Sequence, residues 1–277
     1  NGFKFTSKLK EKLLELKDKR IDKFTAKFHT QISYDGYRVH NLKRLTVGSS
    51  KGSADEVRKT LEWVKENGIP FTIKSTITMD TLKYIYDSYV DVTNYATKNS
   101  GYFPTLDYFN DLTNTEKYEE YVNDMKVGLK KIAAHMIELK KNNQHVPVFK
   151  WFEKSLANCS AGTDMFVIDV DGKIYACHGC LYSTEKDEHF VQSIYDADFS
   201  GINESAKLHS SCFQYVPKEC STCEATFCVR CNIVRYGTSE KESYQERWVD
   251  YTNRPDLCNV YKEVGKIARA YRKIINR

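Results

Sequence analysis

The run Cys220-Ser-Thr-Cys223-Glu-Ala-Thr-Phe-Cys228-Val-Arg-Cys231 places four cysteines within a short segment. All nine cysteines of the 277-residue chain follow residue 158, and the other five are Cys159, Cys177, Cys180, Cys212 and Cys258. Thiolates at such close spacing indicate a metal site, and their softness selects Zn²⁺ or iron–sulfur clusters. Zinc ribbons separate their two pairs by about 15–20 residues, whereas compressed runs with a distant extra cysteine suit cubane clusters better. The spacing therefore favours iron–sulfur clusters, with zinc as the alternative.

The composition is that of a folded chain with a buried core, since 41% of the residues are hydrophobic and 29% are charged. The net charge of +5 is spread along the sequence, which argues against a nucleic-acid partner. No apolar run approaches the roughly 18 residues that a membrane span needs, so we expect no membrane partner. An odd number of cysteines and a cysteine-free first half argue against a secreted disulfide scaffold. We therefore expect reduced thiols and a cytoplasmic location.

The first half of the chain alternates between strand and helix patterns. Strands are predicted over residues 27–34, 71–78 and 102–108 by their β-branched and alternating residues. Helices are predicted over residues 7–16, 53–67, 81–97 and 113–142, and capping boxes open the second (Ser53-Ala-Asp-Glu56) and the last. Strands separated by helices imply a parallel sheet, which binds ligands at the carboxyl ends of its strands. Ser33 and Asp35-Gly36 lie at such an end, although Asp35-Gly36 is equally the signature of a simple turn.

The second half begins with a hairpin pattern. Residues 166–170 and 173–176 are strand-like, and the intervening Asp171-Gly172 predicts a type I′ turn. Such a hairpin delivers Cys177 at the end of its second strand, while Cys159 lies shortly before the first. The two cysteines can therefore approach each other.

These cysteines have the spacing of a known family. Cys159-x12-Gly172-x4-Cys177 resembles the opening of the SPASM domain of radical SAM enzymes. The family continues with Cys-x2-Cys-x5-Cys-x3-Cys and a distant cysteine. Here the run from Cys220 to Cys231 is one residue short in each of two gaps, and Cys258 supplies the distant cysteine.

The first half carries a second part of the resemblance. The segment Ile32-Ser-Tyr-Asp-Gly36 is similar to the fourth barrel strand of radical SAM enzymes and is followed by His40-Asn41, Arg44 and Gly48. The resemblance thus covers nearly the whole chain. It implies an α/β fold, with a partial (β/α)6 radical SAM barrel that lacks its first strands in residues 1–148. Residues 149–277 would form a small SPASM domain with a β-hairpin and a C-terminal helix.

The resemblance also implies two auxiliary [4Fe–4S] clusters and S-adenosyl-L-methionine (AdoMet) as cofactors. The first cluster would take Cys159, Cys177 and Cys231, with Cys180 or Cys212 as a fourth ligand. The second would take Cys220, Cys223, Cys228 and Cys258. Ser33 resembles the residue that contacts the cofactor ribose, and Arg44 is a further candidate for a polar contact to that cofactor.

The implied function is an oxidoreductase that modifies a peptide or protein by hydrogen abstraction with a 5′-deoxyadenosyl radical. The auxiliary clusters would transfer electrons or bind substrate, and a flavodoxin or ferredoxin would be the electron donor. The alternative is a non-catalytic zinc- or cluster-binding interaction module on an α/β scaffold. Metal content separates the two.

Two positions depart from the family. The motif Cys-x3-Cys-x2-Cys, which holds the catalytic cluster, is absent from these 277 residues; we expect it upstream of Asn1 and expect this fragment alone to be inactive. Sulfatase-maturating members carry Asp as a proton acceptor directly after the cysteine that matches Cys177. His178 stands there instead; a neutral imidazole can accept a proton, but an exposed loop histidine is the simpler interpretation.

Overall fold

The computed structural model describes residues 4–17, 30–95, 102–106, 117–147, 149–153, 160–214, 218–226, 228, 236–237, 239–250 and 255–276. The chain divides into two compact units. Unit 1 contains Asn1–Lys154 and Glu263–Arg277, and unit 2 contains Ser155–Lys262. Each unit is built around a three-stranded sheet. No helix among the described residues is long and apolar enough to cross a membrane.

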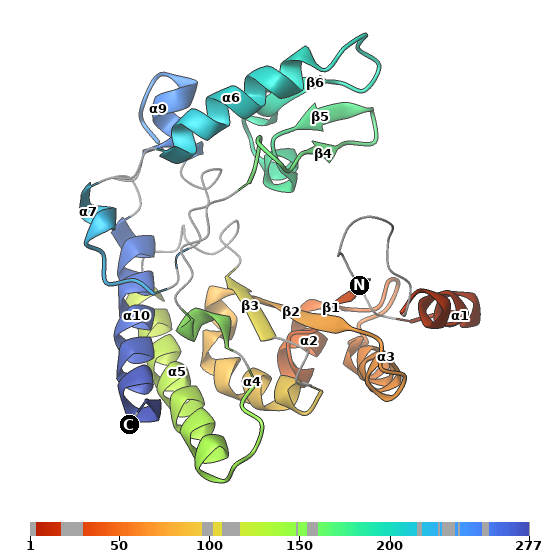
Figure 1. Cartoon of the computed structure of the whole chain (residues 1–277), viewed down its shortest axis with the longest axis vertical. Coiled ribbons are helices and arrows are strands. Elements are labelled where there is room, and N and C mark those ends of the chain that lie inside the picture. The colour runs from red at the N-terminus through yellow and green to blue at the C-terminus, as the bar shows by residue number, and fades with distance from the viewer. Residues whose placement is uncertain are drawn as a thin grey trace. The chain divides into compact units, whose positions relative to one another are not determined.

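The sheet of unit 1 is parallel, which confirms the prediction from the alternating strands and helices. Its strands are β1 (Thr30–Ser33), β2 (Phe71–Ile77) and β3 (Tyr102–Leu106), in that order (Figure 1). All three predicted strands are present. Residues 27–29 and 107–108 of the predicted strands lie outside the described residues.

Helices cover one face of this sheet. The short helix α2 (Tyr37–Lys43), α3 (Ala54–Glu66) and α4 (Ile85–Thr93) lie on the same side of it (Figure 1). This side holds the core of the unit, where Ile32 and Ile73 are buried with Leu61 and Tyr89. A 3-10 helix, η1 (Met79–Tyr84), precedes α4, so the helix predicted over residues 81–97 begins as a 3-10 segment at Met79 and becomes α-helical only at Ile85. Helix α1 (Ser7–Leu16) has the predicted bounds.

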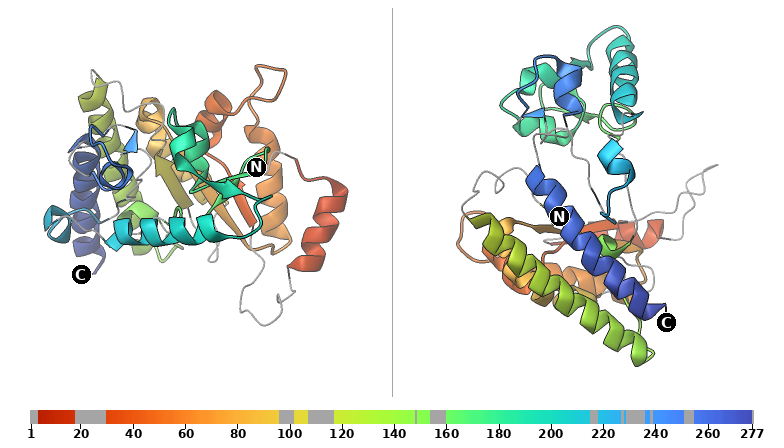
Figure 2. Two further views of the ribbon diagram at one scale, coloured as in Figure 1. Left: turned by 90° about the horizontal axis from the view of Figure 1, so that it is seen from above. Right: turned by 90° about the vertical axis from the view of Figure 1, so that its left-hand side faces the viewer.

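Two long helices lie side by side at the edge of unit 1. Helix α5 (Tyr118–Lys141) and the final part of α10 (Pro255–Ile275) are adjacent in both views of Figure 2. Lys126 forms an ion pair with Glu263 at 3.2 Å. The ring of Phe152, at the end of η3 (Lys150–Phe152), packs on Tyr271 of α10. The second predicted capping box, at residues 113–116, lies outside the described residues.

The predicted capping box of α3 is wrong. Ser53 stands at the N-cap, but its side chain makes no capping bond. Its hydroxyl donates instead to the Arg44 carbonyl at 2.8 Å and lies 3.1 Å from His40 Nε2. The amide of Ala54 is satisfied by Asn41 Oδ1 at 3.0 Å. A tertiary contact from α2 has thus replaced the local cap, because the loop before α3 folds back against that helix.

Unit 2 contains an antiparallel sheet in the order β4 (Val167–Ile168), β5 (Lys173–Tyr175) and β6 (Phe190–Ser193). The β4–β5 hairpin has its predicted place, but its turn is not type I′. The Gly172 amide donates to the Asp169 carbonyl at 3.0 Å, and among the hairpin's turn residues a positive φ, of 76°, occurs at Gly172 alone. This is a type I turn that ends in a left-handed glycine. Strand β6 was not predicted.

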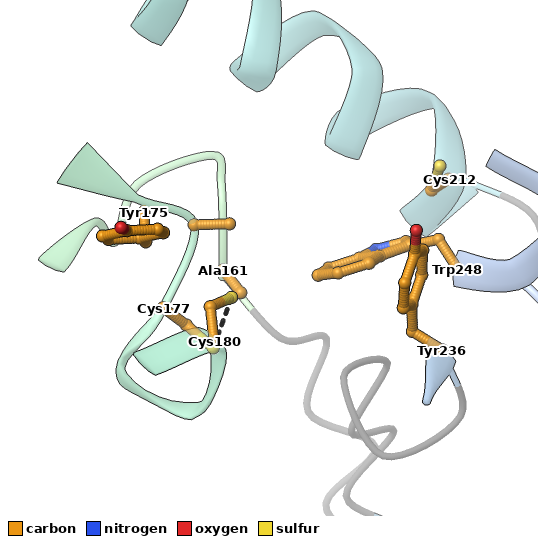
Figure 3. Packing of buried hydrophobic residues seen from close by; sticks show 8 residues of the cluster. Ala161, Tyr175, Cys177, Cys180, Cys212, Tyr236 and Trp248 are labelled. Carbon is orange, nitrogen blue, oxygen red and sulfur yellow. Dashed lines mark hydrogen bonds between the residues drawn. The ribbon is translucent and has the colours of Figure 1, made fainter. Parts of the chain in front are cut away.

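Short helical segments complete unit 2. They are η4 (His178–Tyr182), η5 (Lys186–His189), α6 (Ser200–Gln214), α7 (Lys218–Ser221) and α9 (Tyr244–Trp248). The buried cluster of this unit contains Tyr175, Tyr236 and Trp248 together with three cysteines (Figure 3). Thiols are therefore part of the core.

Candidate functional site

One face of the unit 1 sheet is polar. Ile32 pairs with Ile73 on the helix-covered face, and both are buried. Ser33 pairs with Lys74 on the opposite face, and both are half-buried. Gln31, Thr72 and Thr76 share that face by the alternation of side chains along a strand. Strands of parallel sheets are usually apolar on both faces, so a polar face indicates a surface that meets a ligand.

Asp35 organises the carboxyl ends of β1 and β2. Its side chain is 2% exposed and accepts from Arg44 Nε at 2.5 Å, Arg44 Nη2 at 3.2 Å and the Thr76 amide at 2.8 Å. Arg44 Nη2 also lies 3.4 Å from Thr76 Oγ1. Burial alone raises the pKa of Asp35, but the contacts with His40, Arg44 and Thr76 outweigh it and hold the pKa below its ordinary value. Asp35 is thus an ionised anchor that fixes Arg44 at the strand ends.

Gly36 allows the chain to leave β1 toward α2. It has φ 83° and ψ 150°, a region that essentially only glycine occupies. A Cβ on Gly36 would stand 2.6 Å from the Cα of Ser88 in α4. The Asp35-Gly36 pair therefore redirects the chain from β1 into α2 and holds a buried carboxylate, while ligand binding at this strand end stays a prediction.

A second buried network ties β1 to α4. Tyr34 donates to Asp91 at 2.6 Å and accepts from Arg58 Nε at 2.8 Å, and Arg58 also pairs with Asp91. The Tyr37 amide donates to the same carboxylate at 2.8 Å. Burial, then the contact with Asp91, raise the pKa of Tyr34 well above its ordinary value. This network fixes the segment that carries Ser33 and Asp35. Beside it, a cavity of about 280 Å³ lies against His40, Arg44 and Ser53.

In unit 2, Cys177 and Cys180 form a compact pair. Cys177 follows the end of β5, Cys180 lies in the next turn, and their sulfurs are 3.8 Å apart (Figure 3). Hydrogen bonds from the Cys180 thiol and from the amides of Cys180 and Gly179 lower the pKa of Cys177 to about 7, although burial opposes the shift. The same thiol contact, together with burial, raises the pKa of Cys180. This turn stabilises one thiolate, as a metal-binding turn does.

The other predicted ligands are more dispersed. Cys212 is buried at the end of α6 beside Trp248, apart from the Cys177–Cys180 pair (Figure 3). Cys220 and Cys223 form a tight turn in which the Ala225 amide donates to the Cys223 sulfur at 3.5 Å. Cys228 and Cys258 are half-buried, and all seven described cysteines are free thiols. Cys159 and Cys231 lie outside the described residues.

No group of three or more metal-ligating side chains is gathered among the described residues. The structure thus brings together one predicted pair, Cys177 and Cys180, and does not describe how the remaining cysteines meet. His178 is exposed at the first position of η4.

A buried hydrogen-bond chain in unit 2 has no counterpart in the sequence analysis. His209 Nδ1 faces the Ser205 carbonyl at 2.8 Å and so carries the proton. Its Nε2 then accepts from Tyr244, 3.3 Å away, and the Tyr244 oxygen accepts from His189 Nδ1 at 3.2 Å. Burial lowers the pKa of His189 to about 4 and keeps it neutral. The three residues line a cavity of about 370 Å³. They are far apart in the sequence, so no local pattern joins them.

Comparison with known proteins identifies the fold. No protein-family model and no curated protein sequence matches the chain. Among solved structures, it is similar to anSMEcpe, an anaerobic sulfatase-maturating enzyme of the radical SAM/SPASM class, with bound AdoMet. That match has a TM-score of 0.66 and 20% identity, and covers 100% of this chain and 70% of the other. Native anSMEcpe with AdoMet and the Cp18Cys peptide matches with the same TM-score at 19% identity, covering 100% of this chain and 74% of the other. The chain therefore has the α/β fold of a radical SAM enzyme structure.

Proposed function

We propose that this chain belongs to a radical SAM/SPASM enzyme that modifies a peptide or protein substrate. The observation that carries the proposal is the likeness in fold to anSMEcpe over the whole chain. The cysteine order from Cys159 to Cys258 supports it independently, because fold similarity takes no account of thiol spacing. In this proposal residues 1–148 are a partial (β/α)6 barrel and residues 149–277 are the auxiliary-cluster domain.

The polar face of the unit 1 sheet is the proposed cofactor and substrate surface. Ser33 contacts the ribose of AdoMet, and Arg44 offers a polar contact through Nη1, since its Nε and Nη2 are held by Asp35 and Thr76. Bound at a reduced cluster, AdoMet supplies the 5′-deoxyadenosyl radical that removes hydrogen from the substrate. The 277 residues hold no Cys-x3-Cys-x2-Cys motif, so within them the role of the barrel residues is to bind and orient. The proposed electron donor is a flavodoxin or ferredoxin.

The cysteines of the second half are the proposed ligands of two auxiliary [4Fe–4S] clusters. We assign Cys159, Cys177, Cys180 and Cys231 to the first and Cys220, Cys223, Cys228 and Cys258 to the second. Cys180 is preferred to Cys212 as the fourth ligand because it shares a turn with Cys177, whereas Cys212 packs beside Trp248 (Figure 3). Amide groups directed at Cys177 stabilise the thiolate form that a ligand needs, and the Ala225 amide donates to the Cys223 sulfur. His178 stays a candidate proton acceptor.

One observation favours the zinc alternative. Two thiolates on one tetrahedral ion, each about 2.3 Å from it, lie about 3.8 Å apart. The sulfurs of Cys177 and Cys180 have that separation without any rearrangement, whereas two ligands of a cubane bind different iron atoms. A zinc-bound interaction module on this α/β scaffold is therefore the second candidate function.

Metal analysis after anaerobic purification separates the two candidates. Two clusters give about eight iron atoms per chain with an equal amount of sulfide, and zinc near one or two atoms per chain without iron would refute the first candidate. Cys180→Ser and Cys212→Ser form a matched pair, since both thiols are buried. We expect Cys180→Ser to alter the first cluster, as seen by electron paramagnetic resonance, and Cys212→Ser to leave the iron content unchanged. If Cys212→Ser alters the cluster and Cys180→Ser does not, Cys212 is the fourth ligand and Cys180 is the spare thiol.

A further inference from the structure

The polar face of the unit 1 sheet carries one positive charge that no described residue neutralises. Lys74 lies in the middle of β2 and pairs in register with Ser33 on one side and Phe103 on the other. It is half-buried, and no ion pair or hydrogen bond joins its ammonium group to the described residues. A lysine is rarely placed inside a parallel strand, where apolar residues are usual. Its presence there calls for a partner.

Three described carboxylates near the ends of β1 and β2 already have cations of their own. Asp35 binds Arg44 at 2.5 Å, Asp80 binds Lys43 at 2.8 Å, and Asp91 binds Arg58. Each of these acids is matched by one base, so none is left for Lys74. On β1 and β2, whose side chains the structure describes, the uncharged side chains of this face belong to Gln31, Ser33, Thr72 and Thr76. The face therefore has an excess of positive charge at Lys74.

We propose that Lys74 binds a carboxylate of the peptide substrate, either an acidic side chain or the C-terminal group. This inference rests on the proposed function and adds the chemical class of the substrate. An ammonium group that is half shielded from water interacts more strongly with a carboxylate than one on the open surface does. The carboxylate of AdoMet is the other source of the same chemistry. Lys74 lies in register with Ser33, the proposed ribose contact, so experiment must distinguish the two sources.

The test is binding to the cluster-loaded chain, measured by calorimetry with two probe peptides. One alternates Gly with Glu, and the other alternates Gly with Gln. We expect the wild-type chain to bind the acidic probe about tenfold more tightly, as one charged hydrogen bond implies. Lys74→Gln should abolish the difference, Lys74→Arg should keep most of it, and raised salt should reduce it. Lys141→Gln, which removes an exposed lysine at the end of α5, is the matched control and should change nothing.

A second pair of probes separates the two sources of carboxylate. S-adenosylhomocysteine carries the amino-acid carboxylate, and methylthioadenosine lacks it. If Lys74→Gln selectively weakens S-adenosylhomocysteine and leaves peptide discrimination intact, the carboxylate is the cofactor's and the proposal is overturned. Equal binding of both peptides to the wild type also overturns it. Failure of the proposed function is distinguishable, because it would appear in the wild type as absent iron, whatever Lys74 does.

Discussion

Replacing Gly36 by Ala should destabilise unit 1 much more than the same replacement at another glycine with positive φ. Gly36 has φ 83° and ψ 150°, and a non-glycine residue in such a region costs about 1–3 kcal/mol. The added Cβ would also lie 2.6 Å from the Cα of Ser88. That neighbour is helix backbone, so α4 itself must move, which costs about 1–3 kcal/mol more. Alanine also lowers the conformational entropy of the unfolded chain, which stabilises the folded state by about 0.4–1 kcal/mol. The net loss is roughly 1–6 kcal/mol.

Gly68 is the matched control. It ends α3 with φ 64°, and an added Cβ would meet nothing within 4 Å. Gly68→Ala therefore costs the backbone strain of a left-handed residue, about 1–2 kcal/mol. The same gain from the lower entropy of the unfolded chain offsets part of this cost, and there is no steric clash. The difference between the two variants therefore reports the contact between Gly36 and α4 together with any additional backbone strain at Gly36.

The free energy of opening of β1 and β2 is measured by native-state hydrogen exchange, because a chain of two units has no single unfolding transition. The measurement is made anaerobically to keep the thiols reduced. Gly36→Ala should lower protection of these strands by roughly 1–3 kcal/mol more than Gly68→Ala does. Equal losses in the two variants would refute the argument, since the close approach of α4 would then have no energetic consequence.

Three further predictions concern buried polar groups. The pKa of His189 is lowered to about 4, so as the pH falls the unfolded state binds a proton before the folded state does. The stability of unit 2 should therefore fall by up to about 3 kcal/mol between pH 6.5 and pH 4. His189→Gln should flatten this dependence in acid titrations followed by circular dichroism. Tyr244→Phe keeps the ring but leaves two imidazole nitrogens without the hydroxyl that bridges them, which should cost about 1–3 kcal/mol in urea denaturation; no loss would contradict the assigned proton directions. Because the pKa of Asp35 is lowered in the folded state, its contribution to stability is complete above its pKa in the unfolded state and is lost as the pH falls through its pKa in the folded state. Asp35→Asn should remove this acid dependence and weaken S-adenosylhomocysteine binding, because Arg44 would lose the carboxylate that fixes it.

The fold could be predicted from the sequence wherever a local pattern decided it. Alternation in Phe71–Ile77 and the helical repeat in Ser7–Leu16 gave those elements their bounds. Local patterns failed where tertiary contacts competed with them. Ser53 has every sequence feature of a helix cap, yet its hydroxyl serves His40 and the Arg44 carbonyl. Nothing within a few residues of Ser53 could reveal that competition.

The candidate site follows only in part from the sequence. Cysteine spacing indicated a metal centre, but the choice between Cys180 and Cys212 depended on which thiol shares a turn with Cys177. Strand β6 and the chain from His209 through Tyr244 to His189 join segments that are distant in sequence. Their formation depends on the packing of unit 2, which a linear pattern does not contain.

The places where this chain departs from the rules for its elements coincide with the proposed ligand surfaces. A parallel strand should be apolar on both faces, yet β2 carries Thr72, Lys74 and Thr76 on one of them. A buried core should avoid groups that ionise, yet Cys177 lies in one with its pKa lowered to about 7. Folding alone selects against both arrangements. Such local costs are expected where a bound group provides the missing interaction, which is the physical reason to look for the substrate at Lys74 and for the metal at Cys177.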